Sequence, residues 1–187
     1  TGPDGALWIA DMYRLVIEHP QWIPEHFQQK YNLRAGDDRG RIYRIVPAGK
    51  RLALPRLDKL SANALVERLA DPNGPVRDLA HQLLIWKNAP ETIVPLETMV
   101  TQCKTPLGRL HALCTLDGLG KLRRQIVAAA LDDEHPGVRR HAVRLSERFV
   151  NQSPELRKAL AMRVDDAHAL FRLQLAYNAG RWDDGAA

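Results

Sequence analysis

The sequence has few of the features that mark a cysteine-stapled, metal-binding or membrane-spanning protein. Its 187 residues include two cysteines, Cys103 and Cys114, whose spacing fits neither a CxxC motif nor a CxxCH haem-attachment motif. No run of 18 or more apolar residues occurs, so no segment is expected to span a membrane. No stretch resembles HExxH, a nucleotide-binding glycine loop or GxSxG. We therefore predict no metal site, and we interpret both cysteines as small buried hydrophobic residues.

The net charge is mildly basic, and most of the basic excess lies in residues 51–187. Lysine and arginine number 27 against 22 acidic residues, a net charge of +5. The basic residues form only short pairs, such as Arg123-Arg124 and Arg139-Arg140. This pattern is typical of solvated helix faces and does not favour nucleic acid as a partner. A nucleic-acid-binding protein stays the weakest of the alternatives, through these arginines: Arg123, Arg124, Arg139, Arg140, Arg144 and Arg148.

Residues 1–50 predict two strands joined by a long loop. The opening "GPDG" is a turn signature, because proline fixes φ and Asp-Gly tolerates positive φ. "ALWIADMY" then predicts a strand buried on both faces, and "RIYRIV" at 41–46 predicts a second, alternating strand. The loop, residues 14–39, contains a predicted short helix over 24–31. Two strands alone are marginally stable in water, so they need helices against them or further strands upstream.

The start of this loop carries the best candidates for chemistry. "DMYR" and "EHP" place Asp11, Arg14, Glu18 and His19 near a strand end, where rigid β scaffolds commonly present functional residues. A carboxylate there could act as a general base or a calcium ligand, and the arginine could hold an anionic group. The alternative is that these residues tie the loop to the next domain through salt bridges.

The quoted stretches also carry a resemblance to a known family. "GPDGALWIAD" with the later "GRIYRI" resembles the last blade of the sugar-dehydrogenase-like β-propellers, which include PQQ-dependent glucose and sorbosone dehydrogenases. "ADMYRLVIEHPQWIP" and "LRAGDDRGRIYRI" are similar to the propeller end in membrane-bound dehydrogenase-like proteins of planctomycete and verrucomicrobial type. In that family HEAT-like repeats and a cytochrome c domain follow the propeller. The resemblance covers residues 1–47 in detail and the rest only in architecture, and the haem motif is absent.

Residues 51–187 contain an internal repeat. Four segments share an arginine at the seventh position: "DPNGPVRDLAHQLL" (71–84), "CKTPLGRLHALCTL" (103–116), "DEHPGVRRHAVRLS" (133–146) and "DAHALFRLQLAYNA" (166–179). The arginines are 32, 30 and 33 positions apart. An amphipathic stretch precedes each segment, at 61–70, 91–101, 121–131 and 154–164, and Ser153 is the predicted N-cap of the last. We therefore predict a mainly α fold, an α-solenoid of about four helix pairs behind a two-stranded propeller remnant.

An acidic turn followed by "VR..A...L" resembles the HEAT repeat. An aspartate near a helix start complements the helix dipole, and each arginine could pair with an aspartate of its own or the next repeat. We expect a structural ladder rather than a ligand site. Its predicted members are Asp71, Arg77, Arg109, Asp133, Arg139, Asp166 and Arg172.

Two of the seven histidines, His111 and His141, follow this arginine in neighbouring repeats. They could form a row on one face of the stacked helices. A metal site would require a third ligand close to them. We interpret them as helix residues on a partly buried face, with the metal site as the alternative.

Together these patterns predict a piece of a secreted, dehydrogenase-like protein. The resemblance implies a periplasmic or extracellular location, and PQQ, calcium or haem c in the parent protein, with no cofactor in this chain. The parent would be an oxidoreductase, whereas this segment alone is not expected to be catalytic. The helical repeats would be a scaffold between propeller and haem domain, with the same chain or another protein as partner. The alternative is a free-standing HEAT-repeat protein-binding module.

Overall fold

The computed structural model describes residues 1–50 and 52–183 and divides the chain into two compact units, Thr1–Pro55 and Arg56–Ala187. The predicted boundary at residue 50 lies close to this division. The described residues contain nine α-helices and one two-stranded antiparallel sheet, so the fold is mainly α, as predicted. No helix in that part of the chain is long and apolar enough to cross a membrane, which agrees with the expectation from hydropathy.

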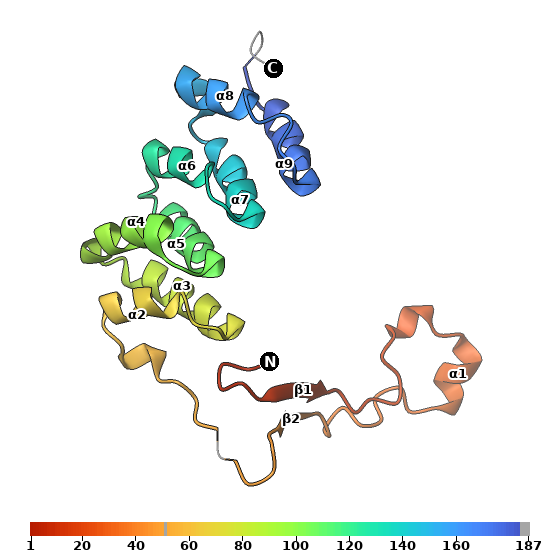
Figure 1. Ribbon diagram of the computed structural model, residues 1–187. Helices are drawn as coiled ribbons and strands as arrows, with labels where there is room; N and C mark the ends of the chain where they lie inside the picture. The colour runs from red at the N-terminus through yellow and green to blue at the C-terminus, as the bar shows by residue number, and fades with distance from the viewer. Residues whose placement is uncertain (51, 184–187) are drawn as a thin grey trace. The chain divides into compact units, whose positions relative to one another are not determined.

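The first unit is a β-hairpin with a long loop (Figure 1). Strand β1 (Leu7–Asp11) pairs with β2 (Arg41–Ile45), so that Leu7 lies opposite Ile45 and Asp11 opposite Arg41. The loop between them holds a 3-10 helix (Pro20–Trp22) and helix α1 (Glu25–Lys30), close to the predicted helix at 24–31. The "GPDG" stretch forms the predicted turn, in which the Gly5 N–H donates to the Gly2 carbonyl at 2.9 Å and Gly5 has φ +80°.

The strands are more exposed than the sequence suggested. Leu7, Trp8 and Ile9 are 51%, 41% and 41% exposed, whereas "ALWIADMY" predicted a strand buried on both faces. This expectation was wrong for the described chain, because the first unit provides no second layer over either face of its hairpin. An open hairpin of this kind is marginally stable by itself.

The second unit is built from eight α-helices among its described residues. They are α2 (Ala62–Arg68), α3 (Gly74–Lys87), α4 (Ile93–Gln102), α5 (Pro106–Gly118), α6 (Arg124–Ala130), α7 (Pro136–Ser146), α8 (Pro154–Ala161) and α9 (Ala169–Ala179). A short 3-10 helix, Leu57–Lys59, precedes α2, and two more, Pro90–Thr92 and Val150–Gln152, precede α4 and α8. Their order matches the predicted alternation of first and second helices.

These helices lie in two layers that follow the repeat (Figure 1). The first helices of the repeats, α2, α4, α6 and α8, contact one another in order. The second helices do the same, with α3 against α5, α5 against α7 and α7 against α9. A continuous apolar core runs between the layers, and it includes Leu65, Leu84, Leu96, Leu113, Leu116, Val127, Val143, Leu160 and Phe171.

Side-chain caps fix where several of these helices begin. Ser61 Oγ accepts from the Ala64 N–H at 3.2 Å, and Ser153 Oγ accepts from the Leu156 N–H at 3.3 Å, which confirms the predicted N-cap of α8. Thr105 caps α5 through Gly108 at 3.3 Å. Each cap satisfies a backbone N–H that the helix leaves unpaired. It therefore fixes the residue at which the helix starts, and with it which side chains face the core.

Candidate functional site

The turn before each second helix is the best-defined polar site of the second unit. Three of these turns begin with an aspartate whose side chain accepts a hydrogen bond from the backbone N–H two residues later. Asp71 accepts from Asn73 at 2.9 Å, Asp133 from His135 at 2.8 Å and Asp166 from His168 at 2.8 Å. This local bond explains why a short acidic residue stands at the position, since it fixes the turn and lies at the helix start.

The repeated arginine binds the same turn from the helix side. In all four repeats its Nη1 donates to the carbonyl of the residue six positions earlier. The four distances are 2.7 Å from Arg77 to Asp71, 2.8 Å from Arg109 to Cys103, 3.0 Å from Arg139 to Asp133 and 2.6 Å from Arg172 to Asp166. This anchor fixes one edge of each guanidinium, so the other edge, Nε with Nη2, is presented in one direction.

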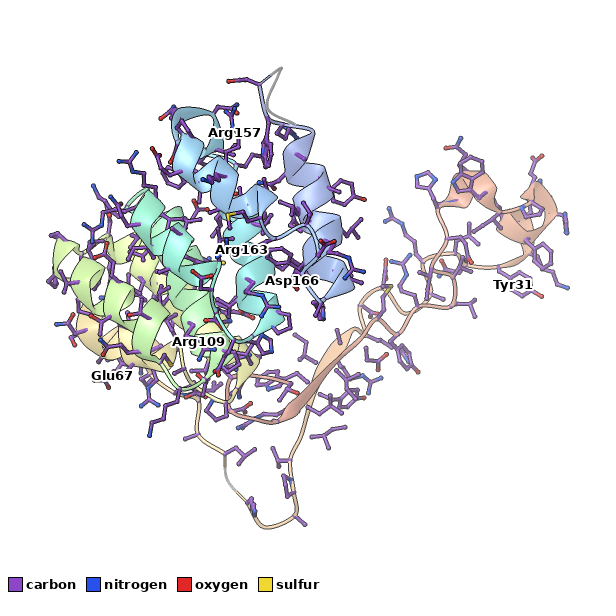
Figure 2. All side chains as sticks on the ribbon, turned by 45° about the horizontal axis from the view of Figure 1, so that its top comes forward. Tyr31, Glu67, Arg109, Arg157, Arg163 and Asp166 are labelled. Carbon is purple, nitrogen blue, oxygen red and sulfur yellow. The ribbon has the colours of Figure 1, made fainter. Side chains whose placement is uncertain are left out.

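In two repeats the Nε and Nη2 edge of the guanidinium binds the aspartate of the next repeat. Arg109 donates from Nε and Nη2 to Asp133 at 2.6 and 2.8 Å, and Arg139 donates in the same way to Asp166 at 3.0 and 3.0 Å. Figure 2 labels Arg109 on α5 and Asp166 in the turn before α9. The Arg109 and Asp133 side chains are 8% and 7% exposed, so this pair is largely shielded from water.

The electrostatics agree with this geometry. The hydrogen bonds with Asp133 raise the pKa of Arg109, against the opposing effect of burial. Burial alone would raise the pKa of Asp166, but the bonds from Arg139 and the His168 N–H outweigh it and lower that pKa. Both shifts favour the charged pair. With their donors and acceptors engaged with each other, these pairs join one helix pair to the next.

The remaining predicted ladder residues do not form such pairs in the described chain. Cys103 stands where an aspartate would face Arg77, and Arg77 Nε is buried without a hydrogen-bond partner among the described residues. Arg172 donates to the carbonyl of its own turn, but no carboxylate within residues 52–183 forms an ion pair with it. Asp71 pairs instead with Arg68 of its own repeat at 3.4 Å.

A histidine row lies beside the ladder on the second helices. The ring centroids of His81 and His111 are 6.3 Å apart, and His81 Nδ1 lies 2.8 Å from Thr115 Oγ1. Burial lowers the pKa of both, and that of His141, where Arg144 and Arg140 lower it further. No three His, Cys, Asp or Glu side chains within residues 1–50 and 52–183 are grouped to hold a metal ion.

The four candidates in the first unit are not brought together around one point. Asp11 Oδ1 accepts from the Tyr13 N–H at 3.1 Å, and its Oδ2 lies 3.8 Å from Arg41. Arg14 lines a cavity at the base of the loop. His19 accepts from the Gln21 N–H at 3.2 Å and so caps the 3-10 helix, while Glu18 is exposed. Asp11 and His19 therefore have local structural roles, and Arg14 is the member that faces a cavity.

Comparison with known proteins adds one finding. A family model described as "Domain of unknown function (DUF7133)" matches residues 1–49, which hold the hairpin and its loop. Searches of curated proteins and of solved structures found no match. The matched residues all lie in the first unit, and the family description names no activity.

Sequence reasoning missed two groups of residues that the structure makes important. Asn178 of α9 is 1% exposed and donates to the Val143 carbonyl at 2.8 Å and to Ser146 Oγ at 3.2 Å, which ties α9 to α7. Tyr13, Gly36 and Arg39 line the cavity with Arg14. The stretches "DMYR" and "RAGDDRG" contain the second group, but neither indicated that they meet at one cavity.

Proposed function

We propose that residues 56–183 form a HEAT-like α-solenoid that acts as a structural scaffold. The observation that carries this proposal is the pair of bidentate contacts, Arg109–Asp133 and Arg139–Asp166, each of which joins one helix pair to the next. Stacked repeats derive their stability from such nearest-neighbour interfaces. Two shielded ion pairs at nearly equal spacing stiffen successive junctions, which supports a role in holding two other domains at a fixed separation.

On the same proposal, residues 1–50 are the last blade of a sugar-dehydrogenase-like propeller. The exposed apolar residues of β1 and β2 support this, since a blade needs further strands to cover them. The parent protein would be a periplasmic or extracellular oxidoreductase that uses PQQ or calcium and passes electrons to haem c. The residues of this chain do not fit haem c attachment, because Cys103 and Cys114 stand eleven positions apart. The haem would belong to a separate domain.

The first test is the coding sequence on both sides of this segment. Repeated short strands upstream and a CxxCH motif downstream would support the proposal, and neither would be found for a free-standing helical module. In the parent protein, residues 56–183 would then be replaced by a flexible linker. We expect oxidation of substrate with a soluble dye to persist, while reduction of the haem slows strongly. Equal haem reduction with either connection would contradict a scaffold role.

A second candidate, a protein-binding module, is favoured by exposed apolar side chains on the second helices. Leu79 of α3, Leu107 of α5, and Leu170 and Leu173 of α9 are 40–50% exposed. Helix α7 interrupts this strip, because its exposed residues include Arg144. A Leu107→Glu variant that loses a defined partner without losing stability would favour this function over the scaffold.

Nucleic acid receives less support from the ion pairs. Of the six arginines that could bind phosphate, Arg123 pairs with Glu97 at 2.6 Å, Arg139 with Asp166, and Arg148 with Asp117. Engaged guanidinium groups would have to give up a carboxylate before they could neutralise a phosphate. Binding of duplex DNA that weakens steeply with salt would be needed to revive this alternative.

A further inference from the structure

The base of the long loop in the first unit lines an open cavity to which no role has been assigned. The two arms of the loop are joined by the Leu15 N–H, which donates to the Ala35 carbonyl at 3.1 Å. Between them lies a cavity of about 570 Å³. It is lined by Tyr13, Arg14, Leu15, Ala35, Gly36, Asp38 and Arg39. A volume of this size suits a small organic molecule.

Two residues with unusual backbone conformations fix the shape of this cavity. Tyr13 has φ +45°, and the Asp11 side chain accepts its N–H at 3.1 Å. Gly36 has φ +86°, and a Cβ at that position would lie 2.0 Å from the Tyr13 carbonyl oxygen. Only glycine allows the two arms to approach so closely. A non-glycine residue with positive φ is uncommon, and such backbone strain occurs preferentially at ligand sites.

The polar groups of the lining are only weakly engaged with the protein. Arg14 makes one long hydrogen bond, from Nη2 to the Leu33 carbonyl at 3.4 Å. Arg39 lies 4.0 Å from Asp38, and these side chains are 66% and 81% exposed, so water screens the pair. The two guanidinium groups therefore keep donors for an anionic ligand, and the Asp38 carboxylate keeps acceptors.

We propose that this cavity binds a small hydroxylated carboxylic acid. Its carboxylate would accept hydrogen bonds from Arg14 and Arg39, because a guanidinium matches a carboxylate with two parallel donors. A ligand hydroxyl would donate to Asp38, and the carbon skeleton would pack on Leu15 and Ala35. The proposal goes beyond the scaffold function and does not rest on it, since the lining comes entirely from residues 13–39.

The test is calorimetric titration of the whole 187-residue chain with three probes. D-glucuronate has both the carboxylate and the hydroxyl groups, D-glucose lacks the carboxylate, and inorganic phosphate is an anion without a carbon skeleton. We expect saturable binding of glucuronate, weaker binding of phosphate and no binding of glucose. Arg14→Ala and Arg39→Ala should each weaken glucuronate binding about tenfold or more, the value of a charged hydrogen bond.

Arg34→Ala is the matched control, because Arg34 is exposed on the same loop and does not line the cavity. It removes the same charge and should change the affinity less than twofold. Arg14→Lys keeps the charge but loses the two parallel N–H donors, so it should weaken glucuronate binding by an intermediate factor. This variant also shows whether the effect of Arg14→Ala comes from a folding defect. No saturable binding of glucuronate, equal binding of glucose or phosphate, or equal losses in all three alanine variants would overturn the proposal.

Discussion

Replacing Cys103 by aspartate should complete the ladder between the first and second repeats. At this junction Arg77 already makes its own-turn bond to the Asp71 carbonyl at 2.7 Å, as Arg109 and Arg139 do in theirs. Its Nε is buried without a hydrogen-bond partner in the described chain. The other edge of the guanidinium is thus presented to a position that holds a thiol where the later repeats hold a carboxylate.

The size of the effect follows from the intact pairs. A buried donor without a partner costs about 1–3 kcal/mol, and a hydrogen bond to a charged group contributes about 1.5–3 kcal/mol. Transfer of the new carboxylate out of water opposes this gain. We expect Cys103→Asp to raise the free energy of unfolding by about 1–2 kcal/mol, or the melting temperature by about 3–6 °C for a unit of this size.

The turn itself should accept the aspartate. Asp71, Asp133 and Asp166 each bind the N–H two residues later, and the corresponding N–H after position 103 belongs to Thr105, the N-cap of α5. Asparagine could make this local bond but lacks the charge. Cys103→Asn therefore separates the contribution of the turn from that of the ion pair.

Urea unfolding followed by circular dichroism at neutral pH gives the measurement, with Arg77→Gln to close a double-mutant cycle. If the ion pair forms, the double-mutant cycle of Cys103→Asp and Arg77→Gln should give an interaction free energy of about 1 kcal/mol or more. If Cys103→Asp stabilises no more than Cys103→Asn, or if its gain persists beside Gln at position 77, the guanidinium edge does not face this position and the reasoning fails.

Three further predictions concern the same helices. Arg109→Ala should lower the free energy of unfolding by about 3–5 kcal/mol in urea titrations, because Asp133 stays behind as a shielded charge. As a control, Arg140→Ala should cost under 1 kcal/mol, because the half-buried Arg140 forms no ion pair within residues 52–183. Asn178→Ala should cost about 1–3 kcal/mol by the same assay, since two buried hydrogen bonds are lost, and a neutral result would exclude its role in joining α9 to α7. Burial lowers the pKa of His111 in the folded state, so below pH 6.5 the unfolded chain binds more protons than the folded chain. The free energy of unfolding should therefore fall as the pH drops from 7 to 5, and in urea titrations His111→Gln should make it depend less on pH over this range.

The helical part of the fold was accessible from sequence because its signals are local and repeated. The arginine period, the prolines at the helix starts and the Ser153 cap each mark a helix boundary, and the structure places α8 and α9 where they indicate. The pairing of Arg109 with Asp133 also follows from the repeat, since a constant period brings the same two positions of adjacent repeats together.

The cavity in the first unit could not be predicted in this way. Its lining comes from both arms of the loop between β1 and β2, residues 12–40, and the contact that joins the arms, Leu15 to Ala35, links residues twenty positions apart. No periodic pattern relates those two arms. "DMYR" pointed to Arg14, but only the positive φ of Tyr13 and Gly36 shows how the arms approach each other.

The junction between the first and second repeats lacks the arginine–aspartate pair that the two later junctions have. Arg109 and Arg139 each join two helix pairs through a bidentate ion pair, whereas the junction at Arg77 relies on apolar packing, on the contact of His81 with Thr115 and on a 4.0 Å contact of His111 with Asp78. In a stack of repeats that interact only with their neighbours, the junction with the fewest polar bonds opens most easily. That junction also contains His81 and His111, whose neutral forms are favoured by burial. The junction without a bidentate ion pair therefore also contains two histidines that burial keeps neutral. Burial outweighs the attraction of Asp78 for a protonated His111, so acid should loosen this junction before the two that carry bidentate ion pairs.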